Sequence, residues 1–149
     1  MTEETALVYG TCVALGGNAA ILVGASGSGK SDLALRFLLS TPAELEPALI
    51  ADDQVRVSLA AGRLIASAPQ TIAGLIEVRG IGVIPLPARE TAEVKLIVRL
   101  VDPDAVPRMP PSPPPTQKVC GIDLPVLMLT PFESSAHFKL RLAIQTVVA

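Results

Sequence analysis

Aromatic side chains are scarce in this chain of 149 residues, which has no tryptophan, one tyrosine and three phenylalanines. Proteins that bind nucleic acid stack bases on aromatic residues and gather basic ones. Here 12 Lys and Arg residues are balanced by 14 Asp and Glu residues, with no run of either sign. We therefore expect no nucleic-acid partner, and we expect a core built from Ala, Val, Leu and Ile.

Long apolar runs and a basic leader are also missing. Gly, Pro or a charged residue interrupts every apolar stretch before it reaches the roughly 18 residues of a membrane span. Glu3 and Glu4 stand where a signal peptide would be basic, so we expect a soluble, cytoplasmic protein with no membrane partner. Cys12 and Cys120 are then expected to be reduced, buried thiols. The length predicts a single domain over residues 1–149.

Apolar runs alternate with turn residues, which predicts strands, hairpins and two helices. Residues 7–15 and 20–23 are expected to form a hairpin around Gly16-Gly17-Asn18. Further strands are expected over residues 48–51, 55–59 and 64–68 as a second hairpin, 72–78, 93–101 and 126–129. Helices are expected from Ser31 to the region of Pro42, and after a cap at Ser134 or Ser135. The prolines between 107 and 115 predict an extended loop.

The stretch GASGSGKSDLAL, residues 24–35, has the glycine spacing of a loop that cradles phosphates. It follows a predicted strand and opens a predicted helix, so backbone N–H groups and the positive end of the helix can face phosphate oxygens. Lys30 would neutralise the β and γ phosphates, and Ser31 would hold Mg²⁺ through its hydroxyl. The residues expected to contact a nucleotide are Gly24, Ala25, Ser26, Gly27, Ser28, Gly29, Lys30, Ser31 and Asp32.

An acidic pair, Asp52 and Asp53, follows the predicted strand 48–51. In an α/β sheet, side chains at this point emerge beside the loop. One carboxylate can order Mg²⁺ and its water, while the other accepts the proton of an attacking hydroxyl. The simpler alternative is a solvated acidic turn. The interval between Lys30 and Asp52 is shorter than in most P-loop NTPases, where the metal-side aspartate follows additional βα units.

Three segments, in this order, resemble the HPr kinase/phosphorylase family in the short form that carries only the catalytic domain: GASGSGKSDLAL, LIADDQV and GLIEVRGIGVI. A weaker match continues through VPRMP to LPVLMLTPFESSAHFKLRLAIQ. The resemblance implies an α/β P-loop kinase domain of the HPr kinase/phosphoenolpyruvate carboxykinase type, with a mixed sheet, flanking helices and hairpins. It also implies a protein serine kinase that uses ATP and Mg²⁺ to phosphorylate HPr, regulates the phosphotransferase system, and removes the phosphate with inorganic phosphate. Full-length members form hexamers, so a homo-oligomer is implied as well.

The resemblance assigns roles to individual acidic residues. Asp52 matches the base that takes the proton from the substrate serine, and Asp53 matches a residue that supports the metal and its waters. Glu77 matches a second metal-coordinating position beside Ser31. Without the resemblance, the sequence would suggest only a surface ion pair between Glu77 and Arg79.

Arginine is the expected partner of the transferring phosphoryl group. Arg108 falls where the family has an arginine in that role, and a planar guanidinium can span two phosphate oxygens as charge shifts between them. The alternative is an ordinary exposed arginine beside a proline-rich loop. Arg79 is a further candidate.

Tyr9 stands where the family has a histidine, in the pair Tyr9-Gly10 before the glycine loop. A phenol with a pKa of about 10 cannot replace imidazole as a base near neutral pH. Tyr9 can donate a hydrogen bond to substrate phosphate, which would leave the kinase step intact and weaken the reverse step. The alternatives are a nucleotide-binding regulatory protein and a small-molecule kinase. His137 lies in the segment that resembles the family's dephosphorylation loop, but a surface histidine on a helix is the simpler interpretation.

Overall fold

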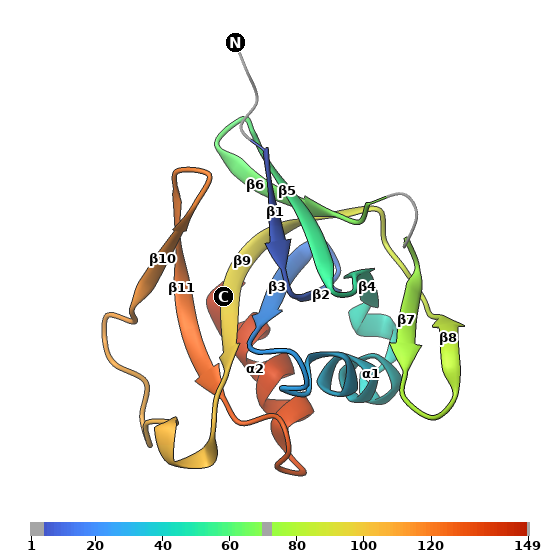
Figure 1. Cartoon of the computed structure of the whole chain (residues 1–149). Helices are drawn as coiled ribbons and strands as arrows, with labels where there is room; N and C mark the ends of the chain where they lie inside the picture. The colour runs from blue at the N-terminus through green and yellow to red at the C-terminus, as the bar shows by residue number, and fades with distance from the viewer. Residues whose placement is uncertain (1–4, 70–72, 149) are drawn as a thin grey trace.

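The structure is a computed structural model that describes residues 5–69 and 73–148, and it consists of a curled mixed sheet with two helices against one face (Figure 1). The helices are α1, Lys30–Ser40, and α2, Ala136–Val148. The strands are β1 Thr5–Tyr9, β2 Thr11–Leu15, β3 Asn18–Val23, β4 Pro47–Ala51, β5 Gln54–Ala60, β6 Arg63–Ser67, β7 Leu75–Val78, β8 Gly82–Pro85, β9 Thr91–Leu100, β10 Thr116–Val119 and β11 Ile122–Leu129. Short 3-10 turns cover Ala43–Leu45 and Pro103–Ala105.

Strand β9 organises the sheet, whose order is β1-β5-β6-β9-β3-β2-β4. The first residues of β9 pair with β6, while residues 97–100 pair with β11. The same strand therefore joins the β5–β6 hairpin and the β10–β11 hairpin to the sheet. Strands β3 and β11 both run parallel to β9. Because the carboxyl ends of parallel strands meet at one edge, the loops that follow β3, β9 and β11 converge there, which is where ligands bind in open α/β sheets.

The central strands are buried on both faces, so two cores share the sheet. In β2 and β3, Val13 and Leu22 face the helices and pack with Phe37 of α1 and Leu140 of α2. Cys12 and the other alternate residues face the opposite core, which the β5–β6 and β10–β11 hairpins cover. This double burial explains why the strands are continuous apolar runs in the sequence. It also gives the loop after β3 a rigid base.

Gly10 divides the predicted strand 7–15 into two strands. A Cβ on Gly10 would lie 2.5 Å from the carbonyl oxygen of Leu22, so only glycine permits this approach. The chain bends there, so β1 pairs with β5, whereas β2 pairs with β3 and β4. The prediction of one unbroken strand was therefore wrong, whereas the β2–β3 hairpin is confirmed.

The remaining predicted elements lie close to the observed ones. The strands at 48–51 and 93–101, the hairpin of β5 with β6 and both helices are confirmed, and the prolines from 107 to 115 lie outside every strand and helix. The sequence did not reveal β8 or β10. Ile72, at the start of one predicted strand, lies outside the described residues.

The two cysteines differ in burial. Cys12 is a buried, free thiol whose pKa burial raises, but Cys120 is only half-buried, so its predicted burial was wrong. Neither of the two helices in the described ranges is long and apolar enough to cross a membrane.

Candidate functional site

The glycine loop, residues 24–29, joins the end of β3 to the start of α1. Gly29 precedes the helix with a φ of 96°, a left-handed conformation that favours glycine, and no side chain caps the helix. The first N–H groups of an uncapped helix lack intrahelical partners. The loop therefore offers backbone donors, at the positive end of a helix of 11 residues, to an anion.

Lys30 and Ser28 fit a bound phosphate chain. The Lys30 ammonium folds back over the loop and donates to the carbonyl oxygens of Gly24, at 2.9 Å, and Ala25, at 3.0 Å. Ser28 Oγ is buried and has no hydrogen-bond partner among the described residues. A buried hydroxyl without a partner is costly, and a phosphate oxygen in the loop would supply one. Lys30 can then exchange carbonyl oxygens for phosphate.

Asp52 follows β4 and joins the acidic pair to the glycine loop. Its Oδ1 accepts hydrogen bonds from Ser31 Oγ, at 2.8 Å, and from Thr11 Oγ1, at 2.9 Å. Its Oδ2 accepts one longer bond, at 3.3 Å, from the backbone N–H of Glu77. The Asp52 residue is only 8% exposed. The predicted proximity of Asp52 to the loop is thus observed, and a merely solvated acidic turn is excluded.

Thr11 is a site residue that sequence reasoning missed. It is fully buried, and its hydroxyl donates to Asp52 from the neighbouring strand β2. A single hydroxyl in the apolar run TCVAL was the available signal, because buried polar groups need partners. The pairing of β2 with β4 then brings Thr11 to Asp52.

Asp53 and Tyr9 lie at the junction of β1 and β5. Asp53 is exposed with a φ of 68°, and its carbonyl oxygen accepts the Gly10 N–H at 3.0 Å. Tyr9 pairs in register with Gln54 and is 69% exposed. The structure therefore brings Tyr9, which the resemblance matches to the family's histidine, beside the acidic pair, although the two segments are distant in sequence.

The predicted metal residues surround the Asp52 carboxylate unevenly. Ser31 donates to it directly, Glu77 touches it through the backbone with its own side chain exposed, and Asp53 is the next residue along the turn. Within the described residues, no three His, Cys, Asp or Glu side chains form a metal-binding group. Mg²⁺ commonly takes one or two protein ligands together with phosphate oxygens and water, so a hydroxyl with one carboxylate beside the loop fits that ion.

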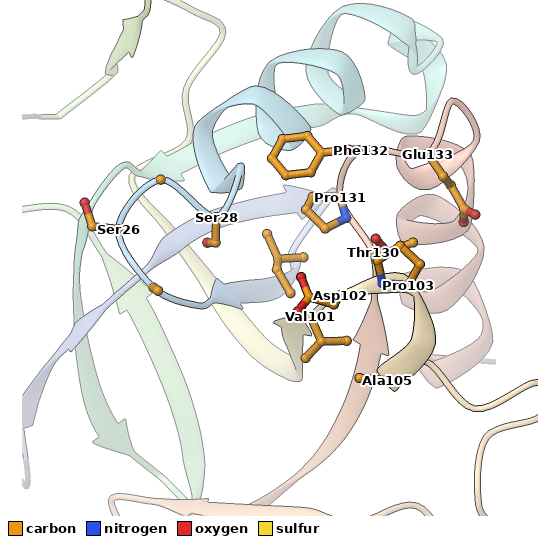
Figure 2. Close-up of a pocket in the computed structure, with 13 residues that line it drawn as sticks. Ser26, Ser28, Val101, Asp102, Pro103, Ala105, Thr130, Pro131, Phe132 and Glu133 are labelled. Atoms are coloured by element: carbon orange, nitrogen blue, oxygen red, sulfur yellow. The ribbon is translucent and has the colours of Figure 1, made fainter.

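A cavity of about 850 Å³ opens on the other flank of the loop (Figure 2). Its walls are the loop itself, the end of β9 with residues 101–105, and residues 130–133 after β11. Phe132 lies at its rim beside the start of α1 in Figure 2, with its Cε1 3.1 Å from the Cβ position of Gly29. The structure thus places the loop between a polar, buried flank at Asp52 and an open flank at Phe132.

Arg36 fixes the segment that carries Phe132. Its guanidinium donates to the carbonyl oxygens of Pro131 and Glu133, the latter at 3.3 Å, and pairs with Asp32 at 3.0 Å. Asp32, which was predicted to contact the nucleotide, instead pairs with Arg36, and its carboxylate is exposed.

Neither Arg108 nor Arg79 lines the cavity beside the loop. Arg108 is exposed and lines a second cavity, of about 580 Å³, between the proline-rich segment and α2. Arg79 is exposed after β7, and the described residues contain no ion pair between it and Glu77. The predicted roles of both arginines stay predictions.

His137 is the second residue of α2 and is half-buried, so it is not a freely exposed surface residue. Its Nδ1 is buried and has no partner among the described residues. Burial lowers the pKa of His137, and the nearby charges of Arg36 and Arg141 lower it further. The neutral imidazole is therefore favoured.

A strand, a glycine loop and a helix, with a buried acid bonded to Ser31 at the start of that helix, define a domain of the P-loop type. The family model of the HPr serine kinase C-terminal domain matches residues 1–130. The solved structure of the Hpr(Ser) kinase/phosphatase from Coxiella burnetii superposes with a TM-score of 0.73 and 25% identity, over 96% of this chain and 88% of that one. The chain belongs to the HPr serine kinase C-terminal domain family, which confirms the resemblance and the expected fold.

Two curated relatives show how much of a longer protein the chain resembles. The HPr kinase/phosphorylase of Clostridium tetani is 36% identical over 88 residues, which are 59% of this chain and 27% of that protein. The HPr kinase/phosphorylase of Lactobacillus acidophilus is 30% identical over 128 residues, 79% of this chain and 38% of that protein. The chain thus spans about a third of the length of such relatives.

Proposed function

We propose that the chain is an ATP-dependent protein serine kinase that phosphorylates HPr and can also remove this phosphate with inorganic phosphate. The observation that carries the proposal is the bond from Ser31, at the start of α1, to the buried carboxylate of Asp52. It sets a candidate base beside the point where the loop would present a terminal phosphate. Family membership supports the activity, because the named relatives are HPr kinase/phosphorylases.

The two oxygens of Asp52 suit different tasks. Oδ1 is held by two hydroxyl donors, from Thr11 and Ser31, whereas Oδ2 accepts only the 3.3 Å bond from the Glu77 N–H. In the proposal, Oδ2 takes the proton of the substrate serine hydroxyl. The serine oxygen then bonds to the γ phosphorus as the bond from that phosphorus to the leaving oxygen breaks. Fixing Oδ1 orients the base, so the protein contributes positioning and charge.

Lys30, the loop amides and Ser28 would hold the phosphate chain and stabilise its charge as it shifts to the leaving group. Ser31, Asp53 and Glu77 are the proposed Mg²⁺ ligands, and Mg²⁺ when bound would neutralise charge on the phosphate oxygens. Arg108 is proposed to stabilise the transferring group. Because it lines the second cavity here, it would have to reach the loop by movement of residues 106–115 or from another subunit, and we include self-association in the proposal.

The test is transfer of labelled phosphate from ATP to HPr in the presence of Mg²⁺, with the natural chain and Asp52→Asn. Removing a positioned base costs about 10²- to 10⁴-fold in rate, so the variant is expected to lose label on the HPr serine. Asp123→Asn is the matched control, since Asp123 pairs with Lys118 on the distant β10–β11 hairpin. Equal transfer by Asp52→Asn would contradict the proposed base.

A second function is favoured by Tyr9, which replaces the family histidine. If the natural chain binds ATP but labels no HPr, it is a nucleotide-binding regulatory protein instead. The variant Tyr9→His distinguishes a kinase whose dephosphorylation step is weak from a chain that transfers no phosphate at all. We expect it to raise phosphate-dependent release from phosphorylated HPr while forward transfer changes little, because imidazole can exchange protons near neutral pH.

A further inference from the structure

The cavity beside Phe132 faces the end of the nucleotide that does not react. Strands β2 and β4 lie on one side of β3, and Asp52 follows β4. Strands β9 and β11 lie on the other side, and the loops after them form the cavity. A triphosphate that runs along the glycine loop with its reacting end at Asp52 must therefore leave the loop on the cavity side.

Away from the glycine loop, the side chains that line the cavity do not favour a second phosphate. None of its lining residues in the described chain is Lys, Arg or His, and two carboxylates, Asp102 and Glu133, lie on its wall. Glu133 is paired with Lys139, so the carboxylate of Asp102 is the group that repels an anion. Its volume of about 850 Å³ falls in the range of small-molecule sites and accommodates a nucleoside. A neutral group with polar edges suits it.

Phe132 offers this group an aromatic face. The residue is 73% exposed although the adjacent Pro131 is buried. The ring edge contacts the loop at Gly29, and Arg36 holds the carbonyl groups on either side of the residue. Because this backbone is already held, it loses little freedom when a ligand covers the ring, which favours binding. Exposed Phe surface also gains free energy when it is covered.

We propose that Phe132 is the stacking platform for the purine base of the nucleotide, and that Arg36 is the residue that positions it. The inference rests on the proposed function, because it assumes that a nucleoside triphosphate occupies the loop. An aromatic side chain can stack on any of the nucleobases, but a ligand without a nucleobase cannot use it. Inorganic tripolyphosphate, which has the phosphates and lacks the nucleoside, is therefore the discriminating probe.

A tryptophan reporter tests the location of the base. The chain has no tryptophan, so Phe132→Trp introduces a single indole at the proposed platform. Magnesium ATP is expected to quench its emission, whereas magnesium tripolyphosphate leaves it unchanged. Phe138→Trp is the matched control, because Phe138 is a half-exposed phenylalanine on α2 that lines neither cavity. Equal quenching in the two variants, or no quenching in Phe132→Trp, overturns the inference.

Calorimetric titration measures how much the ring contributes. Phe132→Ala is expected to weaken ATP binding by about 5- to 150-fold, the range found for base stacking, and to leave tripolyphosphate binding unchanged. Phe132→Tyr should bind ATP like the natural chain, and Phe138→Ala should change the affinity for neither ATP nor tripolyphosphate. If the natural chain binds ATP and tripolyphosphate equally and Phe132→Ala has no effect, the platform is wrong while the phosphate loop stands. If neither ligand binds, the proposed function fails and the platform with it.

Discussion

The two flanks of the glycine loop differ in how they are built. On one flank, Thr11 and Ser31 hold the Asp52 carboxylate in a buried, hydrogen-bonded cluster. On the other, Phe132 stands exposed at the rim of a cavity. Among the described residues, no Lys, Arg or His side chain lines this cavity. Groups that move a proton must be held in place, whereas a surface that stacks a base needs only a fixed ring.

This difference favours one orientation of a nucleoside triphosphate along the loop. The polar flank suits the reacting end of a triphosphate, and the open flank suits its nucleoside. Variants of the polar flank should therefore change the rate of transfer, while variants of the open flank should change the affinity for ATP and leave the affinity for tripolyphosphate intact. Each variant below tests this separation.

After Asp52→Asn, replacing Lys30 is expected to have the largest effect. Lys30→Met removes the ammonium that lies over the loop, and loss of one preorganised donor to a developing charge costs about 10²- to 10³-fold in rate. Binding of ATP and of tripolyphosphate should both weaken, because both place phosphates in the loop. Calorimetry and the transfer assay measure these effects. Lys95→Met is the control, since Lys95 pairs with Glu93 on β9; a comparable loss there would indicate a general effect of charge.

Thr11→Val tests the buried cluster without changing the shape of the side chain greatly. Asp52 Oδ1 would keep only the Ser31 bond, and we expect a loss of about 1–3 kcal/mol in the free energy of unfolding. Transfer should fall at least about tenfold at saturating ATP, because the base is less well oriented. Urea denaturation and the transfer rate measure the two changes.

Thr41→Val is the matched control for Thr11→Val. Thr41 is also buried, and its hydroxyl donates to the Phe37 carbonyl oxygen at the far end of α1. It should lower stability but leave transfer unchanged at a temperature where the chain stays folded. If both threonine variants lose transfer to the same degree, Thr11 has only a structural role.

Arg36→Gln addresses the open flank and should have a smaller effect. It removes the guanidinium bonds to the carbonyl groups around Phe132, each worth about 0.5–1.5 kcal/mol, so ATP affinity should fall by about 2- to 10-fold. Tripolyphosphate affinity should not change. Arg141→Gln is the control, because Arg141 donates to the Ser40 carbonyl oxygen between the same two helices. A loss of tripolyphosphate affinity in Arg36→Gln would show that the flanks are not independent.

Local sequence signals predicted the parts of the fold that local rules determine. The apolar runs of β4 and β9, the turn at Ala61-Gly62 and the helix after the glycine loop all follow from residue type and spacing. The break at Gly10 did not, because it depends on a contact with Leu22. The polar strand β10, Thr116–Val119, was missed because it is short and its only buried residue is Val119.

The same distinction holds for the site. The glycine loop is one contiguous segment, and the bond from Ser31, just after it, to Asp52 spans 21 residues. Thr11 lies 41 residues from Asp52, and the carbonyl group of Glu133 lies 97 residues from Arg36. Only the pairing of β2 with β4 and the docking of residues 130–133 on α1 bring them together, and nothing in residue spacing shows this. The family resemblance named Asp52 but neither Thr11 nor Phe132.

His137, on α2, gives the smallest expected effect, which is on stability. Burial and the charges of Arg36 and Arg141 lower its pKa, so the folded state binds a proton less readily than the unfolded state. Stability should therefore be fully present above the ordinary histidine pKa of about 6.5 and should decrease as the pH falls below it. Because the chain has one histidine, its imidazole NMR signal can be titrated directly, and the midpoint should lie below 6.5.

The arginine variants refine this titration. Arg36→Gln and Arg141→Gln each remove one cation near His137, so each should move the midpoint back toward the ordinary value without restoring it, because burial remains the larger cause. His137→Gln should make stability less dependent on pH below 6.5 and leave ATP binding unchanged at neutral pH, because the lowered pKa favours the uncharged imidazole there. A midpoint above 6.5 in the natural chain would mean that a carboxylate, not the two arginines, dominates the surroundings of α2's first turn.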